Sequence, residues 1–196
     1  MIPEVYNEFH FAWEMDFLQA LQGIHSAPLD VIMKIVTYLG EAGLLWIALS
    51  IVLAIIPKTR KCGFTMMFAM AITFILGNLV FKNIIARGRP CWVDESVAML
   101  IKKPHDFSFP SGHTMNGITA SLCIFFYYHK AGIGAIVVAC LIAFSRMYLF
   151  VHWPTDIIGG MLLGAIDAVI SFFVVKKIYE SVVRAIEKKK AAKEEA

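Results

Sequence analysis

Three polar segments interrupt an otherwise membrane-like sequence, and together they hold the side chains that could carry out a reaction. The segments are residues 82–90 (KNIIARGRP), 110–113 (PSGH) and 145–156 (SRMYLFVHWPTD). Cations bind phosphate oxygens, histidine works as an acid, a base or a nucleophile, and a carboxylate can orient an imidazole. These residue types therefore predict cleavage of a phosphate ester.

The third segment predicts a nucleophile with an orienting partner. Because proline is favoured in the first turn of a helix, Pro154 places His152 just before a helix N-terminus, where an anion is stabilised. Asp156, in that first turn, can reach back to one ring nitrogen of His152 and leave the other free to attack phosphorus. Taken alone, this motif also fits a capping interaction without catalysis.

The second segment predicts an anion site at the start of another helix. Ser111 can cap the helix or donate its hydroxyl, and Gly112 lets the backbone approach an oxyanion closely. His113 is then placed to protonate a leaving oxygen. An ordinary N-cap beside an interfacial histidine explains the isolated motif better.

Three basic residues are expected to hold the phosphate. Lys82 and Arg89 are seven residues apart, about two helical turns, so both can point the same way if the helix persists. Arg146 lies near the end of an apolar segment, where an unpaired charge is costly and needs an anion. Snorkelling to lipid phosphates explains any one of these cations but not all three. Arg87 is expected to be a headgroup anchor instead.

The order and spacing of the three segments resemble the signature of the type 2 phosphatidic acid phosphatase family. That signature runs Lys-x6-Arg-Pro, then Pro-Ser-Gly-His, then Ser-Arg-x5-His-x3-Asp. Here Lys82 is followed by six residues and Arg89-Pro90, and Arg146 is followed by five residues, His152, three residues and Asp156. One PSGH is a weak signal, whereas three motifs in the right order are a strong one.

The resemblance implies a role for each residue of the motifs. His152 would be the nucleophile that forms a phosphohistidine, His113 the general acid and then base, and Asp156 the residue that orients His152. The implied phosphate ligands are Lys82, Arg89, Ser111, Gly112 and Arg146. The family requires no metal, so no metal or other cofactor is expected, and the sequence contains no acidic cluster suited to Mg²⁺.

Composition predicts an integral membrane protein. Of 196 residues, 59% are hydrophobic, and the mean hydropathy is +0.69. We expect one domain over residues 1–196 with an all-α fold, a polytopic transmembrane bundle of five to six helices. The expected spans are residues 42–57, 63–82, 131–150 and 157–175, with a shorter one at 114–128. Residues 30–41 are expected to extend the first span or bend along the interface.

The two ends of the chain are expected to differ from this bundle of residues 28–178. Residues 1–27 should form an amphipathic helix in the headgroup region, with a sixth spanning helix as the alternative. Residues 179–196 should form a basic cytoplasmic tail. The apolar stripe of the N-terminal helix consists of Phe9, Trp13, Phe17, Leu21 and Ile24, with Glu14 and Gln22 off it.

Polar residues and charges along the chain predict further features. Asp167, near the middle of the last span, is expected to be hydrogen-bonded inside the bundle, with Asn78 and Asn116 as candidate partners. Basic clusters at residues 58–61 and 176–193 indicate cytoplasmic segments. Five spans then bring all three motifs to the extracytoplasmic face of the cell inner (plasma) membrane.

The predicted function is metal-independent hydrolysis of a lipid phosphate or diphosphate. The resemblance implies undecaprenyl diphosphate, phosphatidylglycerophosphate or phosphatidate as substrate, and Lys102-Lys103 beside the site favours a diphosphate slightly. Expected partners are the lipid phosphate substrate and membrane lipids, not nucleic acid, and the oligomeric state stays open. The alternatives are a phosphotransferase of the same family and a lipid-headgroup transporter, although a transporter predicts two related halves, which the sequence does not show.

Overall fold

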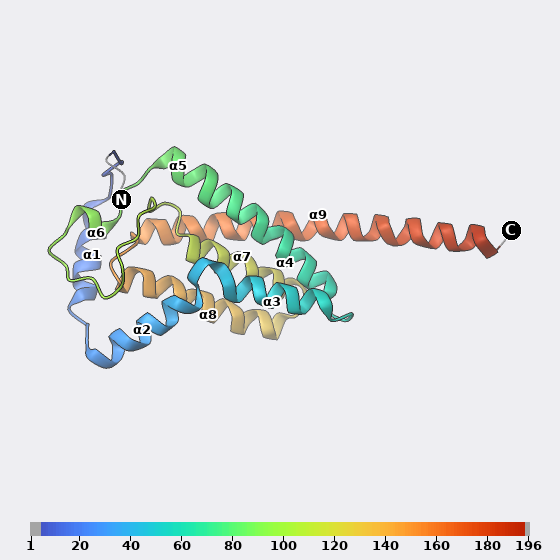
Figure 1. Cartoon of the computed structure of the whole chain (residues 1–196), viewed down its shortest axis with the longest axis horizontal. Helices are drawn as coiled ribbons and strands as arrows, with labels where there is room; N and C mark the ends of the chain where they lie inside the picture. The colour runs from blue at the N-terminus through green and yellow to red at the C-terminus, as the bar shows by residue number, and fades with distance from the viewer. Residues whose placement is uncertain (1–4, 195–196) are drawn as a thin grey trace.

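The computed structural model describes residues 5–194, and this part of the chain is nearly all helical (Figure 1). The helices, in chain order, are α1 (Ala12–Gln22), α2 (Ala27–Leu39), the 3₁₀ turn η1 (Glu41–Gly43), α3 (Leu44–Ile55), α4 (Arg60–Thr73), the π-helix η2 (Phe74–Phe81), α5 (Lys82–Ile85), α6 (Pro90–Val93), α7 (Gly112–Tyr127), α8 (His129–Tyr148) and α9 (Pro154–Glu194).

The described residues contain four helical segments that are long and apolar enough to cross a membrane. They are Ala27–Ile55, Arg60–Ile85, His129–Tyr148 and Pro154–Val182. The shorter α7, with 16 residues, packs against α4, α8 and α9 inside the bundle. Large apolar side chains on the outside of the spanning helices are exposed, as lipid-facing residues would be. The predicted all-α polytopic bundle is confirmed.

The first spanning segment bends sharply where α2 meets α3. Ala42 and Gly43 both have positive φ, 49° and 69°. A Cβ on Gly43 would lie 3.0 Å from Nδ2 of Asn116, so glycine is needed there for space as well as for conformation. Residues 30–41 therefore extend the first span, and the bend lets Glu41 lie beside the site described below.

The three polar motifs lie at one end of the bundle. In Figure 1 this is the left-hand end, where α5 and α8 finish and α7 and α9 begin. The basic turn between α3 and α4 and the C-terminal part of α9 lie at the opposite end. α9 is longer than the predicted span at residues 157–175, because it continues as one helix to Glu194 and extends past the other helices.

Helix α1 lies at the motif end and does not span. Its 11 residues are about 16 Å long, roughly half the thickness of a hydrocarbon core. The alternative of a sixth spanning helix therefore fails. The expected stripe is divided, because Leu21 is buried with Leu18 against the chain that joins α8 to α9. Four members of the stripe face outward: Phe9, Trp13, Phe17 and Ile24.

Asp167 is hydrogen-bonded inside the bundle, but not to the expected partners. Its carboxylate accepts hydrogen bonds from Oγ1 of Thr73 at 2.6 Å and Oγ of Ser171 at 2.9 Å. The prediction that Asn78 and Asn116 are its partners was wrong. Both asparagines line the cavity near the motifs instead.

Close packing of α7 against α8 yields a test of the fold. A Cβ on Gly132 would lie 2.2 Å from Cα of Phe125, whereas a Cβ on Gly134 would meet no atom within 4 Å. We expect Gly132→Ala to lower the melting temperature in detergent by about 5 °C or more, since backbone cannot yield easily. The control, Gly134→Ala, should leave it unchanged or raise it slightly. Equal melting temperatures for the two variants would contradict this packing.

Candidate active site

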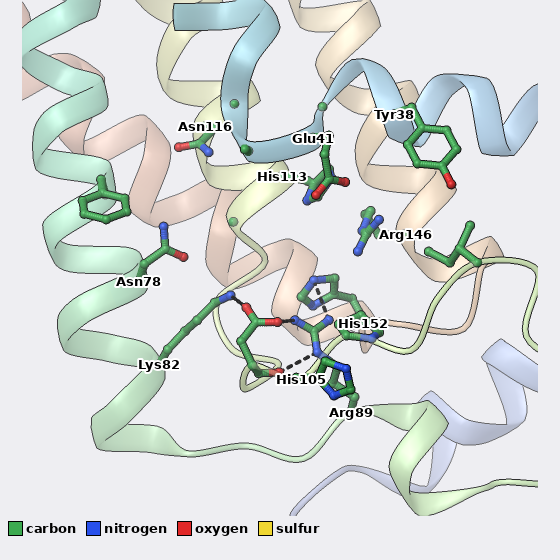
Figure 2. A pocket seen from close by; sticks show the side chains of 18 of the residues that line it. Tyr38, Glu41, Asn78, Lys82, Arg89, His105, His113, Asn116, Arg146 and His152 are labelled. Atoms are coloured by element: carbon green, nitrogen blue, oxygen red, sulfur yellow. Dashed lines mark hydrogen bonds and ion pairs between the residues drawn. The ribbon is translucent and has the colours of Figure 1, made fainter. Parts of the chain in front are cut away.

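A cavity of about 580 Å³ opens at the motif end of the bundle (Figure 2). Six of the eight residues predicted for the site line it, and they come from all three motifs. Ser111 and Asp156 lie behind its wall. The six lining residues are Lys82, Arg89, Gly112, His113, Arg146 and His152.

His152 is held in one orientation by the residues that follow it. Its Nδ1 lies 3.2 Å from Oδ2 of Asp156, and that oxygen also accepts a hydrogen bond from the backbone N–H of Trp153 at 2.8 Å. With the ring proton on Nδ1, Nε2 carries the lone pair, and it lies 3.2 Å from Nη1 of Arg89. The predicted pair of His152 and Asp156 is therefore present, with one nitrogen directed at a cation-lined cavity.

The electrostatic environment favours the neutral form of His152. Burial lowers its pKa well below the ordinary value, and the positive charges of Arg89 and Arg146 lower it further. The side chain is only 1% exposed. An imidazole that does not take up a proton near neutral pH keeps its lone pair available for bond formation.

Arg89 is fixed mainly by backbone carbonyls. Nη1 donates to the carbonyl oxygen of Val151 at 2.7 Å, and Nε donates to that of Asp106 at 2.7 Å. Nη2 donates to Oδ1 of Asp106 at 2.8 Å. Backbone carbonyls therefore supply most of the hydrogen bonds that hold this guanidinium, and the Asp106 side chain supplies one more.

Arg146 has the least complete set of partners. Its Nη1 donates to Oγ1 of Thr37 at 2.6 Å, but its buried Nε has no partner among the described residues. The residue is 5% exposed and lines the cavity. Arg146 is thus a buried cation whose partner is a neutral hydroxyl and whose Nε donor is unused, so it is suited to bind an incoming anion.

Asp106 was missed by the sequence analysis. Its carboxylate forms ion pairs with Lys82 and Arg89, the two cations of the first motif (Figure 2). Burial would raise the pKa of Asp106, but the charges of Arg89 and Lys82 outweigh burial and hold it well below its usual range. A carboxylate therefore occupies the position between two cations that a phosphate could take. Its proximity to the PSGH segment was the only signal in the sequence.

The PSGH segment starts α7 as predicted. Oγ of Ser111 accepts a hydrogen bond from the N–H of Thr114 at 3.5 Å, while its own N–H donates to the carbonyl of Asp156 at 3.2 Å. Ser111 is thus the N-cap, and its role as a phosphate ligand stays a prediction. His113 lies on the cavity wall, with Nε2 at 3.7 Å from Oε2 of Glu41.

Arg87 is not a headgroup anchor, and that expectation was wrong. It is 5% exposed and pairs with two buried carboxylates. Nη1 lies 2.6 Å from Oδ1 of Asp156, and Nη2 lies 2.7 Å from Oε2 of Glu14. Glu14 was placed off the apolar stripe of α1, yet it is fully buried. Asp156 also accepts a hydrogen bond from Oγ of Ser108.

Within residues 5–194, no three His, Cys, Asp or Glu side chains lie close enough together to hold a metal ion. The charges that face the cavity are those of the basic side chains together with Asp106 and Glu41.

Comparison with known proteins places this geometry in a family. The sequence model of the PAP2 superfamily matches residues 61–180, which include all three motifs. An undecaprenyl-diphosphatase from Sulfolobus acidocaldarius is 31% identical over 160 residues, which cover 81% of this chain and 77% of that protein. Phosphatidylglycerophosphatase B from Bacillus subtilis is 33% identical over 169 residues, with coverage of 80% and 78%.

A solved structure has the same arrangement of helices. The crystal structure of a transmembrane PAP2 type phosphatidylglycerolphosphate phosphatase from Bacillus subtilis matches with a TM-score of 0.69 at 29% identity. The match covers 87% of this chain and 86% of that one.

The position of Asp106 predicts competition between its carboxylate and an incoming anion. Asp106→Asn should lower the concentration of orthovanadate or inorganic phosphate needed for half inhibition by about two- to fivefold, since a partly exposed ion pair is worth roughly 1 kcal/mol or less. Asp94→Asn is the control, because Asp94 precedes the same loop and its carboxylate contacts Ser96 rather than a residue of the cavity. Weaker inhibition of Asp106→Asn would contradict this view and indicate that Asp106 holds the cations in place.

Proposed function

The chain belongs to the PAP2 superfamily and is a lipid phosphatase, and we propose that it releases phosphate from a lipid phosphate or diphosphate through a phosphohistidine at His152. The observation that carries the proposal is the orientation of His152. Asp156 holds Nδ1, while Nε2 lies at the wall of the cavity beside Arg89.

In the first step, Nε2 of His152 forms a bond to phosphorus while the bond from phosphorus to the leaving oxygen breaks. His113 gives its proton to that oxygen, so the lipid leaves as an alcohol or a monophosphate. The imidazole of His152 becomes cationic, and Asp156 stabilises this charge through Nδ1.

In the second step, water takes the place of the leaving group. His113, now neutral, accepts a proton from the water, whose oxygen bonds to phosphorus as the bond to Nε2 breaks. Inorganic phosphate leaves, and both histidines return to their starting states. One acid and one nucleophile are therefore sufficient for both halves of the reaction.

The charge that develops on the phosphoryl oxygens is stabilised by permanent parts of the protein. Lys82, Arg89 and Arg146 supply three cations at the cavity, and Gly112 and His113, which line it at the start of α7, are proposed to add their backbone N–H groups. No step of the proposed mechanism requires a metal.

The substrate is proposed to be an amphipathic lipid with a terminal phosphate. The cavity lies where the spanning helices end, so a headgroup can enter while its chains stay in the bilayer. Undecaprenyl diphosphate and phosphatidylglycerophosphate are candidates in line with the names of two relatives, and phosphatidate is a third candidate. Lys102 and Lys103 line the cavity and favour a second phosphate, although Lys103 is partly neutralised by Glu95.

Substitution of the two histidines tests the mechanism. His152→Ala and His113→Ala should each lower phosphate release by about 10³-fold or more, assayed on phosphatidate and on a prenyl diphosphate in detergent with EDTA. With ³²P-labelled substrate, the parent protein quenched during turnover should contain an alkali-stable phosphoprotein, whereas His152→Ala should not. His129→Ala, at the far end of the bundle, is the control. Activity of His152→Ala within tenfold of the parent would exclude this mechanism.

The cavity is proposed to face the extracytoplasmic side, because the basic clusters in the turn between α3 and α4 and in the C-terminal part of α9 lie at the opposite end. Glu95 is exposed at the cavity end and Lys58 at the other. In a Cys140→Ala background, where Cys62, Cys91 and Cys123 are buried, a membrane-impermeant maleimide should label Glu95→Cys in intact cells. Lys58→Cys should react only after the membrane is permeabilised. The reverse pattern would place the site inside the cell.

A further inference from the structure

Helix α1 carries a buried carboxylate that the proposed reaction has not used. α1 lies outside the residues matched by the PAP2 superfamily model, and Glu14 on it is 0% exposed. Oε1 of Glu14 accepts hydrogen bonds from the N–H of Thr155 at 3.0 Å and from its hydroxyl at 2.6 Å. A carboxylate from α1 therefore binds the first turn of α9, directly after the segment that contains His152.

Arg87 joins this carboxylate to Asp156. One edge of its guanidinium contacts Oε2 of Glu14, and Nη1 donates to Oδ1 of Asp156 at 2.6 Å and to Oγ1 of Thr155 at 2.7 Å. Nε donates to the carbonyl of Phe9 at 3.0 Å. The two oxygens of Asp156 are thus divided, with Oδ1 on Arg87 and Oδ2 facing Nδ1 of His152.

The charges in this network matter because all three side chains are buried. Arg87 alone would neutralise Asp156 and oppose a positive charge on His152. Glu14 neutralises Arg87 instead, so the group of two carboxylates and one guanidinium carries one net negative charge. That charge lies where the imidazole becomes cationic as Nε2 bonds to phosphorus.

We propose that Glu14 is a positioning residue for the reaction, which acts through Arg87 on Asp156 and so sets the orientation and basicity of His152. The inference rests on the proposed role of His152 as nucleophile. On this proposal, α1 contributes a side chain that influences the reaction and does not only pack against the bundle.

The alternative is that Glu14 merely docks α1 onto the bundle. Apolar contacts also hold α1 there, since Leu18 and Leu21 pack with Tyr148, Phe150 and Trp153. The two roles differ in their effect on proton binding by His152. The other charged or titratable groups that face His152 are Asp156, Arg89, Arg146, Lys82 and His113, with Asp106 acting in turn through its charge.

Two opposite charge changes separate the roles. Glu14→Gln leaves Arg87 uncompensated, which disfavours protonated His152, so the acidic limb of the kcat/KM profile should move to lower pH by about half a unit or more. Turnover should fall about tenfold with KM within threefold, because a weaker nucleophile is formed without loss of phosphate ligands. Arg87→Gln leaves two carboxylates unpaired by a cation, and the limb should move to higher pH.

The double variant Glu14→Gln/Arg87→Gln restores the single net negative charge. Its acidic limb should return to within about 0.3 pH units of the parent, with turnover above that of Glu14→Gln. It leaves one buried carboxylate instead of two, and Asp156 still accepts hydrogen bonds from Ser108 and from the N–H of Trp153, so it keeps the test available if either single variant fails to fold. Asp16→Asn, an exposed charge change on the same helix, should leave the profile unchanged.

The outcomes are distinct. If folded single variants move the limb in the same direction or not at all, or if the folded double variant is the least active of the three, Glu14 only docks α1. His152→Ala is measured alongside. If that variant keeps its activity, the proposed function fails, whereas loss of its activity with unshifted profiles for the network variants overturns this inference alone.

Discussion

Burying guanidinium groups where a membrane bundle ends is costly unless each one faces an anion or a carbonyl, and this constraint accounts for much of the structure around the cavity. Arg89 is held by carbonyls and by Asp106, and Arg87 by two carboxylates. Arg146 has only Thr37, together with one unused donor. The guanidinium of Arg146 is therefore the buried cation at the site that lacks an anion among the described residues. We expect the phosphate of the substrate to supply that anion.

Residues with irregular backbone conformation position several charged or titratable side chains around the cavity. Ala42, Ala86 and Phe150, the non-glycine residues with positive φ in the described part of the chain, each lie within two residues of a group at the site. The bend at Ala42 brings Glu41 to His113, the turn at Ala86 directs Arg87 inward, and the one at Phe150 precedes His152. Such conformations cost about 1 kcal/mol or more and persist where the surrounding packing requires them.

The bundle and most of the cavity wall could be predicted because their signals are local. Apolar runs mark the spans, and the three motifs combine residue type with fixed spacing, so counting helices brings them to one end. Asp106 and Glu14 gave no such signal. Each acts through a partner elsewhere in the chain, and a carboxylate in a loop or an amphipathic helix is ordinarily solvated. Asn78 and Asn116 were predicted to bond Asp167, and that partner was wrong. Helix periodicity shows that a side chain faces the interior, but not whether it meets a cavity or a neighbouring helix.

Arg87 pairs with buried carboxylates instead of lipid phosphates because of a neighbouring helix. A basic residue near an interface is normally free to reach lipid phosphates, and nothing in residues 82–90 opposes that. Helix α1 determines where Arg87 lies in this structure. The buried Leu18 holds α1 on the bundle, and Glu14 on the same helix binds the start of α9. Contact with α1 thus makes Arg87 part of a buried ion pair. If Glu14 acts as proposed, the docking of α1 onto the bundle and the charge on His152 are coupled through Arg87 and Asp156.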